Sequence, residues 1–306
     1  MLVWLLRGIL LVEILAAVML HPADAGPVVP FVVVFVLAVA GLTLVPGYVV
    51  AIIGASPRPA GVGGPTLGAA VAEWLAFVAG FVVIMPFERW WMGSDAIGRL
   101  PPGRRPVLLV HGYMCNRGFW WWIRRELRAR GFAVATITLE TPFSDIEIQA
   151  DRLVERIAAL RAETGAEAVL LVTHSMGGLV ARAALRKGAA AHVARFVTLG
   201  GPHHGTVVAR AGLGRDARQM EPGNAWLAEL NRVETTEVPT TTIWSTGDEI
   251  VVPQATSRLA GANEVVVAAM GHVAMAFSPL IRDLVAAELA ADAGASAAPL
   301  TDAGRA

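Results

Sequence analysis

The 306-residue sequence has few of the side chains that several classes of protein need. Its single cysteine, Cys115, excludes an internal disulfide framework and a cysteine-based zinc site. Its 25 basic residues are balanced by 25 acidic ones, and this zero net charge argues against a basic nucleic-acid-binding surface. Charged residues make up only 16% of the chain, against about 25% in typical soluble domains. The hydrophobic fraction of 55% excludes disorder for most of the chain.

The scarcity of charge is concentrated at one end of the sequence. Of the 50 charged residues, only five lie in residues 1–87, namely Arg7, Glu13, Asp24, Arg58 and Glu73. The other 219 residues hold the remaining 45, or about 20%, which is close to the value for a soluble domain. The sequence therefore predicts an apolar N-terminal third joined to a globular C-terminal part.

Residues 2–20, 28–53 and 67–87 are three candidates for membrane-spanning helices. The second is free of charge over 26 positions. At 1.5 Å per residue it forms about 39 Å of helix, more than the roughly 30 Å of a bilayer's hydrocarbon core. The third contains Glu73, whose carboxyl costs roughly 2.5–3.5 kcal/mol near the middle of a bilayer on insertion scales. We therefore expect Glu73 to face a neighbouring helix or to lie near one end.

A signal peptide is the alternative interpretation of residues 2–20, because residues 23–25 (Ala-Asp-Ala) have the small-x-small form of a cleavage site. Glu13 would then lie within the apolar region of that peptide, and for this reason we favour three spans joined by loops at 21–27 and 54–66. Arginines follow the last span closely. We expect an integral protein of the cell (inner) membrane, and the positive-inside rule favours the cytoplasmic face for the globular part.

Short apolar runs alternate with helical patterns after a linker over residues 88–105. We expect strands at 106–110, 132–138, 168–173, 193–199, 240–245 and 264–268, and helices at 119–130, 146–162, 176–187 and 278–290. This alternation predicts a mostly parallel sheet with helices on both faces, over residues 106–290. Residues 291–306 are expected to be a disordered tail. Ligands of such sheets bind at the carboxyl ends of the strands.

The segment Thr-His-Ser-Met-Gly-Gly, residues 173–178, lies where an apolar strand gives way to a helix. A sharp turn there lifts the hydroxyl of Ser175 above the sheet, and small neighbours such as Gly177 and Gly178 let the strand and helix approach closely. Thr173 replaces the first glycine of the usual G-x-S-x-G pattern. The simpler interpretation of Ser175 is a helix-capping serine.

A nucleophilic serine needs a base and an acid that orients the base. Asp248 follows the expected strand 240–245, and His272 follows the strand 264–268. Each could instead be an ordinary turn residue, and Glu249 competes with Asp248 for the role of the acid. The chain order Ser, Asp, His is the order used by α/β sheets of this kind. Because all three follow strands, one sheet edge can bring them together.

Acyl transfer also needs donors for the developing oxyanion, and these are usually backbone N–H groups. We expect one from Met176, the residue after the nucleophile, and the other from Tyr113 in the loop after the first strand. Gly112 would let that loop turn closely.

Five motifs in this order resemble bacterial lipases and esterases of the alpha/beta-hydrolase superfamily: VLLVHGYMCNRGFW, THSMGG, LGGPHHGT, STGDEIVVP and GHVAMAF. The resemblance covers about residues 105–290 and does not include the N-terminal spans. It implies an alpha/beta-hydrolase fold with Ser175 as nucleophile, Asp248 as acid, His272 as base and the oxyanion donors above. It implies no metal and no organic cofactor.

The function that we expect is a membrane-anchored serine hydrolase acting on carboxylic esters, with a lipid or other acyl ester as substrate. An acyltransferase that uses the same triad and a non-catalytic membrane scaffold are the alternatives. Of the remaining motifs, we expect a structural role for His203 and His204 and a buried position for Cys115. The aromatic run 119–122 is either helix packing or a wall for acyl chains, and residues 207–237 could hold a lid.

Overall fold

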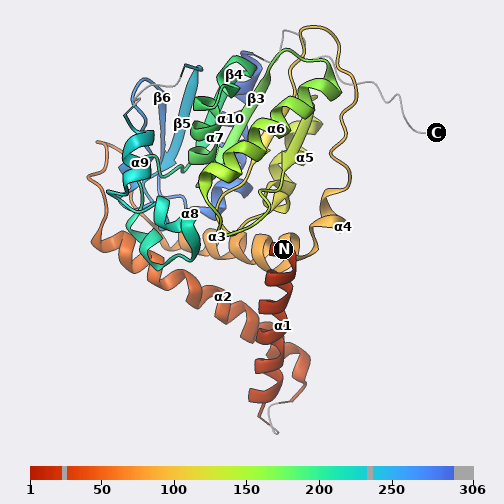
Figure 1. The fold of residues 1–306 in the computed structure, drawn as a ribbon. Helices are drawn as coiled ribbons and strands as arrows, with labels where there is room; N and C mark the ends of the chain where they lie inside the picture. Colours follow the sequence, from red (N-terminus) through yellow and green to blue (C-terminus); the bar gives the residue numbers. More distant parts are fainter. Residues whose placement is uncertain (23–25, 233–236, 293–306) are drawn as a thin grey trace, which may run out of the picture.

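The computed structural model describes residues 1–22, 26–232 and 237–292 (Figure 1). The first two apolar helices are α1 (Leu2–Leu20) and α2 (Val28–Ile53), with the expected bounds. The third apolar stretch runs further than expected, to Met92, inside the region assigned to the linker. It consists of α3 (Leu67–Phe77), the π-helical η1 (Val78–Ile84), the 3₁₀ turn η2 (Met85–Phe87) and α4 (Glu88–Met92).

These three helices are long and apolar enough to cross a membrane. Most of their large side chains point away from the rest of the molecule: Trp4, Met19 and Ile53 are each more than 70% exposed. Exposed apolar surface on this scale marks contact with another apolar phase, so membrane association accounts for it. The cleavage site of the alternative signal peptide, residues 23–25, lies outside the described residues.

The globular part is built on a six-stranded sheet whose described strands are all parallel, in the order β2-β1-β3-β4-β5-β6. The strands are β1 (Val107–Val110), β2 (Val134–Ile137), β3 (Val169–His174), β4 (Val193–Leu199), β5 (Thr240–Ser245) and β6 (Asn263–Val267). The fold class expected from the sequence is confirmed, and each strand lies within two residues of its expected bounds.

Two apolar clusters sandwich the sheet, because alternate residues of each strand point to opposite faces. Leu108 packs with the side chains of α6 (Ile146–Thr164) and α7 (Gly177–Arg186). Leu109, its neighbour, packs on the other face with α5 (Trp121–Ala129) and α10 (Pro279–Ala290). The remaining described elements are short: η3 (Arg117–Trp120), η4 (Ala189–His192), η5 (Val207–Ala211), α8 (Gly214–Gln219), α9 (Ala225–Leu230), η6 (Gln254–Ser257) and η7 (Val273–Phe277).

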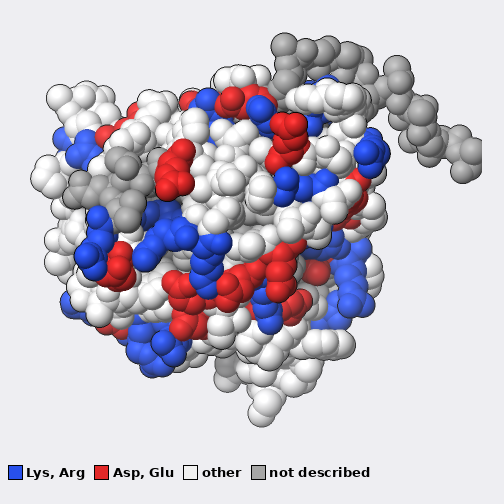
Figure 2. Space-filling model, turned by 45° about the horizontal axis from the view of Figure 1, so that its top comes forward, with Lys and Arg blue, Asp and Glu red and all other residues white. Residues whose placement is uncertain are grey.

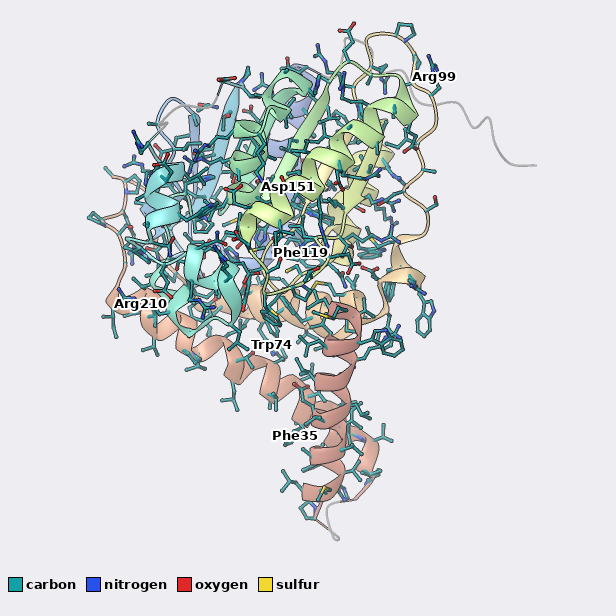
Figure 3. All side chains as sticks on the ribbon, viewed as in Figure 1. Phe35, Trp74, Arg99, Phe119, Asp151 and Arg210 are labelled. Atoms are coloured by element: carbon teal, nitrogen blue, oxygen red, sulfur yellow. The ribbon has the colours of Figure 1, made fainter. Side chains whose placement is uncertain are left out.

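The apolar helices lie against the carboxyl end of the sheet, where α3 runs across the molecule beneath the strands (Figure 1). The indole nitrogen of Trp74 in α3 donates to the carbonyl of Leu37 in α2 at 3.0 Å, and Figure 3 shows Trp74 where the two helices meet. Arg7 of α1 donates to the carbonyl of Pro86 at 2.8 Å. The part of the molecule turned forward in Figure 2 carries charges of both signs, whereas the protruding helices are largely uncharged. The apolar surface thus lies on the side on which α/β sheets bind their ligands.

Candidate active site

Ser175 occupies a strained turn between β3 and α7. Its φ of +55° is left-handed, a conformation that costs a non-glycine residue free energy and is kept where the surroundings enforce it. A Cβ atom added at Gly177 would lie 2.6 Å from the carbonyl oxygen of His111, so only glycine fits there. Thr173, the departure from the usual motif, is fully buried within β3. The strand-to-helix turn expected around Ser175 is therefore present.

Asp248 and His272 are brought together after β5 and β6. The Nδ1–H of His272 donates to Oδ2 of Asp248 at 2.8 Å. The other oxygen of Asp248, Oδ1, accepts from the backbone N–H groups of Ile250 and Val251 at 2.9 and 2.7 Å. Burial lowers the pKa of His272, but the charge and hydrogen bond of Asp248 outweigh it, and the pKa ends above its ordinary value. Of the two acids that the sequence offered, Asp248 is the one on the imidazole.

His174 connects the serine turn to the histidine loop. Its ring lies 4.4 Å from the ring of His272, centroid to centroid, and its Nε2–H donates to the carbonyl of His272 at 3.0 Å. Within the described part of the chain the Ser175 hydroxyl makes no hydrogen bond. The proposed chemistry therefore needs one more link, from Ser175 Oγ to His272 Nε2, and links of this kind often tighten only when substrate binds.

The loop after β1 is oriented by His111. The ring donates from Nδ1 to the carbonyl of Gly112 and accepts at Nε2 from the N–H of Leu139, both at 2.9 Å. Burial lowers the pKa of His111 to about 4, so the ring stays neutral in this one tautomer. Because a trans peptide points its C=O and N–H in opposite directions, fixing the Gly112 carbonyl also fixes the N–H of Tyr113.

The two expected oxyanion donors thus lie on fixed backbone. Met176 stands just before the first residue of α7, where backbone N–H groups have no partner within the helix. The hydroxyl of Tyr113 bonds to both the N–H and the carbonyl of Leu213, at 2.9 and 2.8 Å. Their role toward an oxyanion stays a prediction. The sequence did not reveal the orienting roles of His111 and His174. Each directly precedes a residue that the sequence motifs pointed to, Gly112 and Ser175 respectively.

The remaining residues that the sequence motifs pointed to have the surroundings of structural residues. The ring of His203 is fully buried, and its carbonyl accepts from the amide of Asn231 at 3.0 Å. Cys115 is buried as expected, and burial raises the pKa of its thiol to about 12. Phe119 and Trp120 are fully buried, with the Phe119 ring 4.5 Å from that of His174, which confirms the packing interpretation for these two (Figure 3). Among the residues that the structure describes, no three His, Cys, Asp or Glu side chains are grouped to hold a metal ion.

Segment 207–237 forms the short helices η5, α8 and α9 between β4 and β5, and its residues 233–236 lie outside the described part of the chain. Ala217 and Leu227 bury their side chains in the domain. A lid function for this segment stays a prediction. The expected disordered tail, 291–306, lies outside the described residues from 293 onward.

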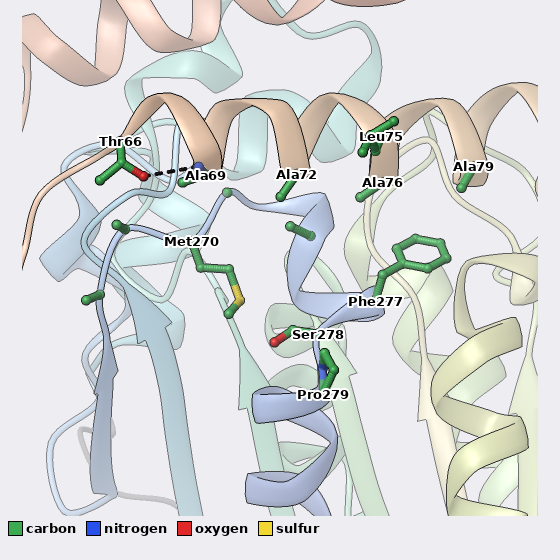
Figure 4. Close-up of a pocket in the computed structure, with 14 residues that line it drawn as sticks. Thr66, Ala69, Ala72, Leu75, Ala76, Ala79, Met270, Phe277, Ser278 and Pro279 are labelled. Atoms are coloured by element: carbon green, nitrogen blue, oxygen red, sulfur yellow. Dashed lines mark hydrogen bonds between the residues drawn. The ribbon is translucent and has the colours of Figure 1, made fainter.

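Two apolar pockets flank the site. The larger, of about 650 Å³, lies between α3 and residues 268–279 (Figure 4). The alanines of α3 face Met270 and Phe277 across it, and Gly271 and Ala274 place it beside His272. The smaller, of about 240 Å³, lies among α1, α2 and the third helix and reaches Met114 in the loop after β1. Both pockets suit apolar chains better than polar ligands.

Comparison with known proteins finds similar sequences over part of the chain. Residues 145–277 match the family model of the PGAP1-like alpha/beta domain. A stretch of 113 residues is 33% identical to a triacylglycerol lipase of Pseudomonas fragi, covering 35% of this chain and 37% of that lipase. The chain thus matches little more than a third of that relative's length.

Solved structures of lipases share the fold. Lipase B of Aspergillus fumigatus superimposes with a TM-score of 0.58 at 20% identity, over 81% of this chain and 66% of that one. The mature lipase BlEst2 of Bacillus licheniformis superimposes with a TM-score of 0.52 at 19% identity, over 59% of this chain and 89% of that one. The globular part of the chain thus has the alpha/beta-hydrolase fold of these lipases, and it is joined to apolar helices.

Proposed function

We propose that this alpha/beta hydrolase is a membrane-anchored serine esterase that cleaves carboxylic esters of lipids. The observation that carries the proposal is the 2.8 Å hydrogen bond between Asp248 and His272, placed beside the strained turn of Ser175. A buried carboxylate that holds an imidazole next to a serine at a strand-to-helix turn is the arrangement that activates a serine nucleophile.

In the proposed reaction the hydroxyl oxygen of Ser175 attacks the acyl carbonyl while His272 takes the proton. Asp248 holds the imidazole in the required tautomer and stabilises its charged form. The N–H groups of Met176 and Tyr113 stabilise the oxyanion. Collapse of this intermediate breaks the ester bond, and His272 gives its proton to the leaving alcohol. Water, deprotonated by His272, then attacks the acyl-enzyme, releasing the carboxylic acid and restoring Ser175.

The apolar surroundings of the site support a lipid as substrate. The apolar helices lie at the carboxyl end of the sheet, where the proposed triad residues follow their strands, and both flanking pockets are lined mainly by apolar side chains. An ester with long acyl chains can enter such a site directly from a bilayer. The arginines that follow the last span, at positions 89, 99, 104 and 105, support a place in the cell membrane with the hydrolase on the cytoplasmic face.

Labelling with a fluorophosphonate probe tests the nucleophile. The full-length protein in detergent should be labelled and should hydrolyse acyl esters, and Ser175→Ala should lose both properties. Ser94→Ala is the matched control, because Ser94 is exposed and lies in a different loop. The proposal fails if the folded, unmodified protein is not labelled, or if Ser175→Ala retains hydrolysis.

A panel of acyl chain lengths, run with and without added alcohols, reports the preferred ester. The same panel shows whether water or an alcohol is the acceptor, which separates a hydrolase from an acyltransferase.

A further inference from the structure

Glu73 of the third apolar helix reaches the chain segment that directly follows His272. Its side chain is completely buried. Oε1 accepts from the N–H of Val273 at 2.8 Å, and Oε2 accepts from the N–H of Ala274 at 2.7 Å. Both oxygens of one carboxyl thus bind consecutive peptide groups about 200 positions away in the sequence. This contact accounts for an acidic residue in an otherwise apolar helix, where an ionisable side chain is costly and calls for a specific partner.

The backbone of His272 is held by further side chains. Oε2 of Glu249 accepts its N–H at 3.1 Å, and His174 donates to its carbonyl. Burial raises the pKa of Glu249 well above its usual range, and the nearby charges of Glu73 and then Asp248 add to the effect. Burial thus favours the uncharged form of Glu249, which limits the accumulation of like charges next to Asp248.

The close approach of helix and loop depends on a missing side chain. A Cβ atom added at Gly271 would lie 2.7 Å from the Cβ of Glu73, closer than real Cβ contacts. The residue before His272 is therefore small enough to let α3 pack against the loop. On the other side, a Cβ atom at Gly47 of α2 would lie 3.3 Å from Cγ of Glu249. Two of the apolar helices thus contact the residues that position His272.

We propose that Glu73 is a positioning residue, which fixes residues 272–274 from the third apolar helix and so aims the imidazole of His272. The inference rests on the proposed esterase function and goes beyond anchoring. The apolar helices complete the catalytic site, and the hydrolase fold without them holds its histidine less firmly.

The test compares Glu73→Gln with the unmodified full-length protein in detergent. Glutamine keeps the shape but presents an NH₂ group to one of the two N–H donors, so one hydrogen bond is lost. We expect kcat on a soluble short-chain ester to fall by about 10- to 100-fold, the scale of a small misplacement of a catalytic group. KM should change by less than about threefold, because Glu73 does not touch the substrate site. Glu155→Gln makes the same chemical change on the exposed surface of α6, without a contact to the loop, and it should keep kcat within about twofold.

Two further variants separate positioning from a general loss of stability. Gly271→Ala changes the loop instead of the helix: the added methyl group pushes the loop away from Glu73, and this variant should show the same fall in kcat. The double variant Glu73→Gln/Glu249→Gln should lose little more than the worse single variant, because both carboxyls hold one segment. Thermal unfolding is measured for every variant, so that kcat is compared between folded proteins only.

Unchanged kcat in folded Glu73→Gln, or a loss carried by KM, overturns the inference. Fully multiplicative losses in the double variant overturn it as well. Ser175→Ala is assayed alongside: activity that survives in this variant refutes the proposed function, whereas Ser175-dependent activity with a normal Glu73→Gln refutes only the role of Glu73.

Discussion

Gly112→Ala is the substitution whose effect follows most directly from the geometry of the site. A Cβ atom at this position would lie 2.7 Å from Cβ of Ser175, 3.1 Å from the carbonyl oxygen of His174 and 3.2 Å from Oγ of Ser175. Carbon atoms in contact normally lie about 3.5–4.0 Å apart, so the loop has to move by about 1 Å. The N–H of Tyr113 moves with it, because it belongs to the next peptide group.

The expected cost is that of losing one oxyanion donor, about 10²–10³ in kcat, or about 2.7–4 kcal/mol of transition-state stabilisation. The crowding itself should lower the free energy of unfolding by about 1–3 kcal/mol. The assay measures kcat on a soluble ester together with thermal unfolding. Gly8→Ala in α1 is the control, because a Cβ there meets open space. A folded Gly112→Ala protein with kcat within threefold of the unmodified one would refute the placement of the oxyanion loop.

Two more predictions concern the triad and the helices. In Asp248→Asn we expect kcat to fall by roughly 10³–10⁴, the scale of losing the orienting carboxylate. Asp248 raises the pKa of His272, and a protonated imidazole cannot act as a base. In the unmodified protein kcat/KM should therefore decline as the pH is lowered, with a midpoint above pH 6.5. Residual activity of Asp248→Asn should show a lower midpoint; an unchanged midpoint argues against the pair. The detached segment 88–306 lacks Glu73 and also Gly63, whose carbonyl accepts from Thr246 at 2.8 Å. It should be at least about tenfold less active on a soluble ester than the full chain, and equal activity contradicts this.

The strands and the first two helices were predictable because their signals are local. The strand Val169–His174 is a short apolar run that ends in a polar turn, and Val28–Ile53 is an uninterrupted apolar stretch. The third helix was predicted too short, because Glu88 and Arg89 look like the end of an apolar segment. The chain continues through π and 3₁₀ turns around Pro86, which has no N–H to donate, and periodicity does not reveal such turns.

The sequence did not show which side chains of the candidate site contact one another. Position after a strand favoured Asp248 but left Glu249 as a rival, and only their side-chain directions distinguish the imidazole contact from the backbone contact. The sequence left two places open for Glu73, facing a neighbouring helix or near one end of its span, and it named no partner; the carboxyl binds Val273 and Ala274 at the start of η7. An apolar pattern shows that a buried carboxyl needs a partner, but it does not identify the partner.

The sequence by itself determined the separation into apolar helices and a parallel α/β sheet, and the order in which Ser175, Asp248 and His272 follow their strands. Those features depend on residue type and on spacing within about twenty positions. Tertiary structure decided that the apolar helices lie across the carboxyl end of the sheet, and that Glu73 meets residues about 200 positions away. Such contacts depend on how whole elements pack, because a side chain's partner is set by the surface that packing brings against it.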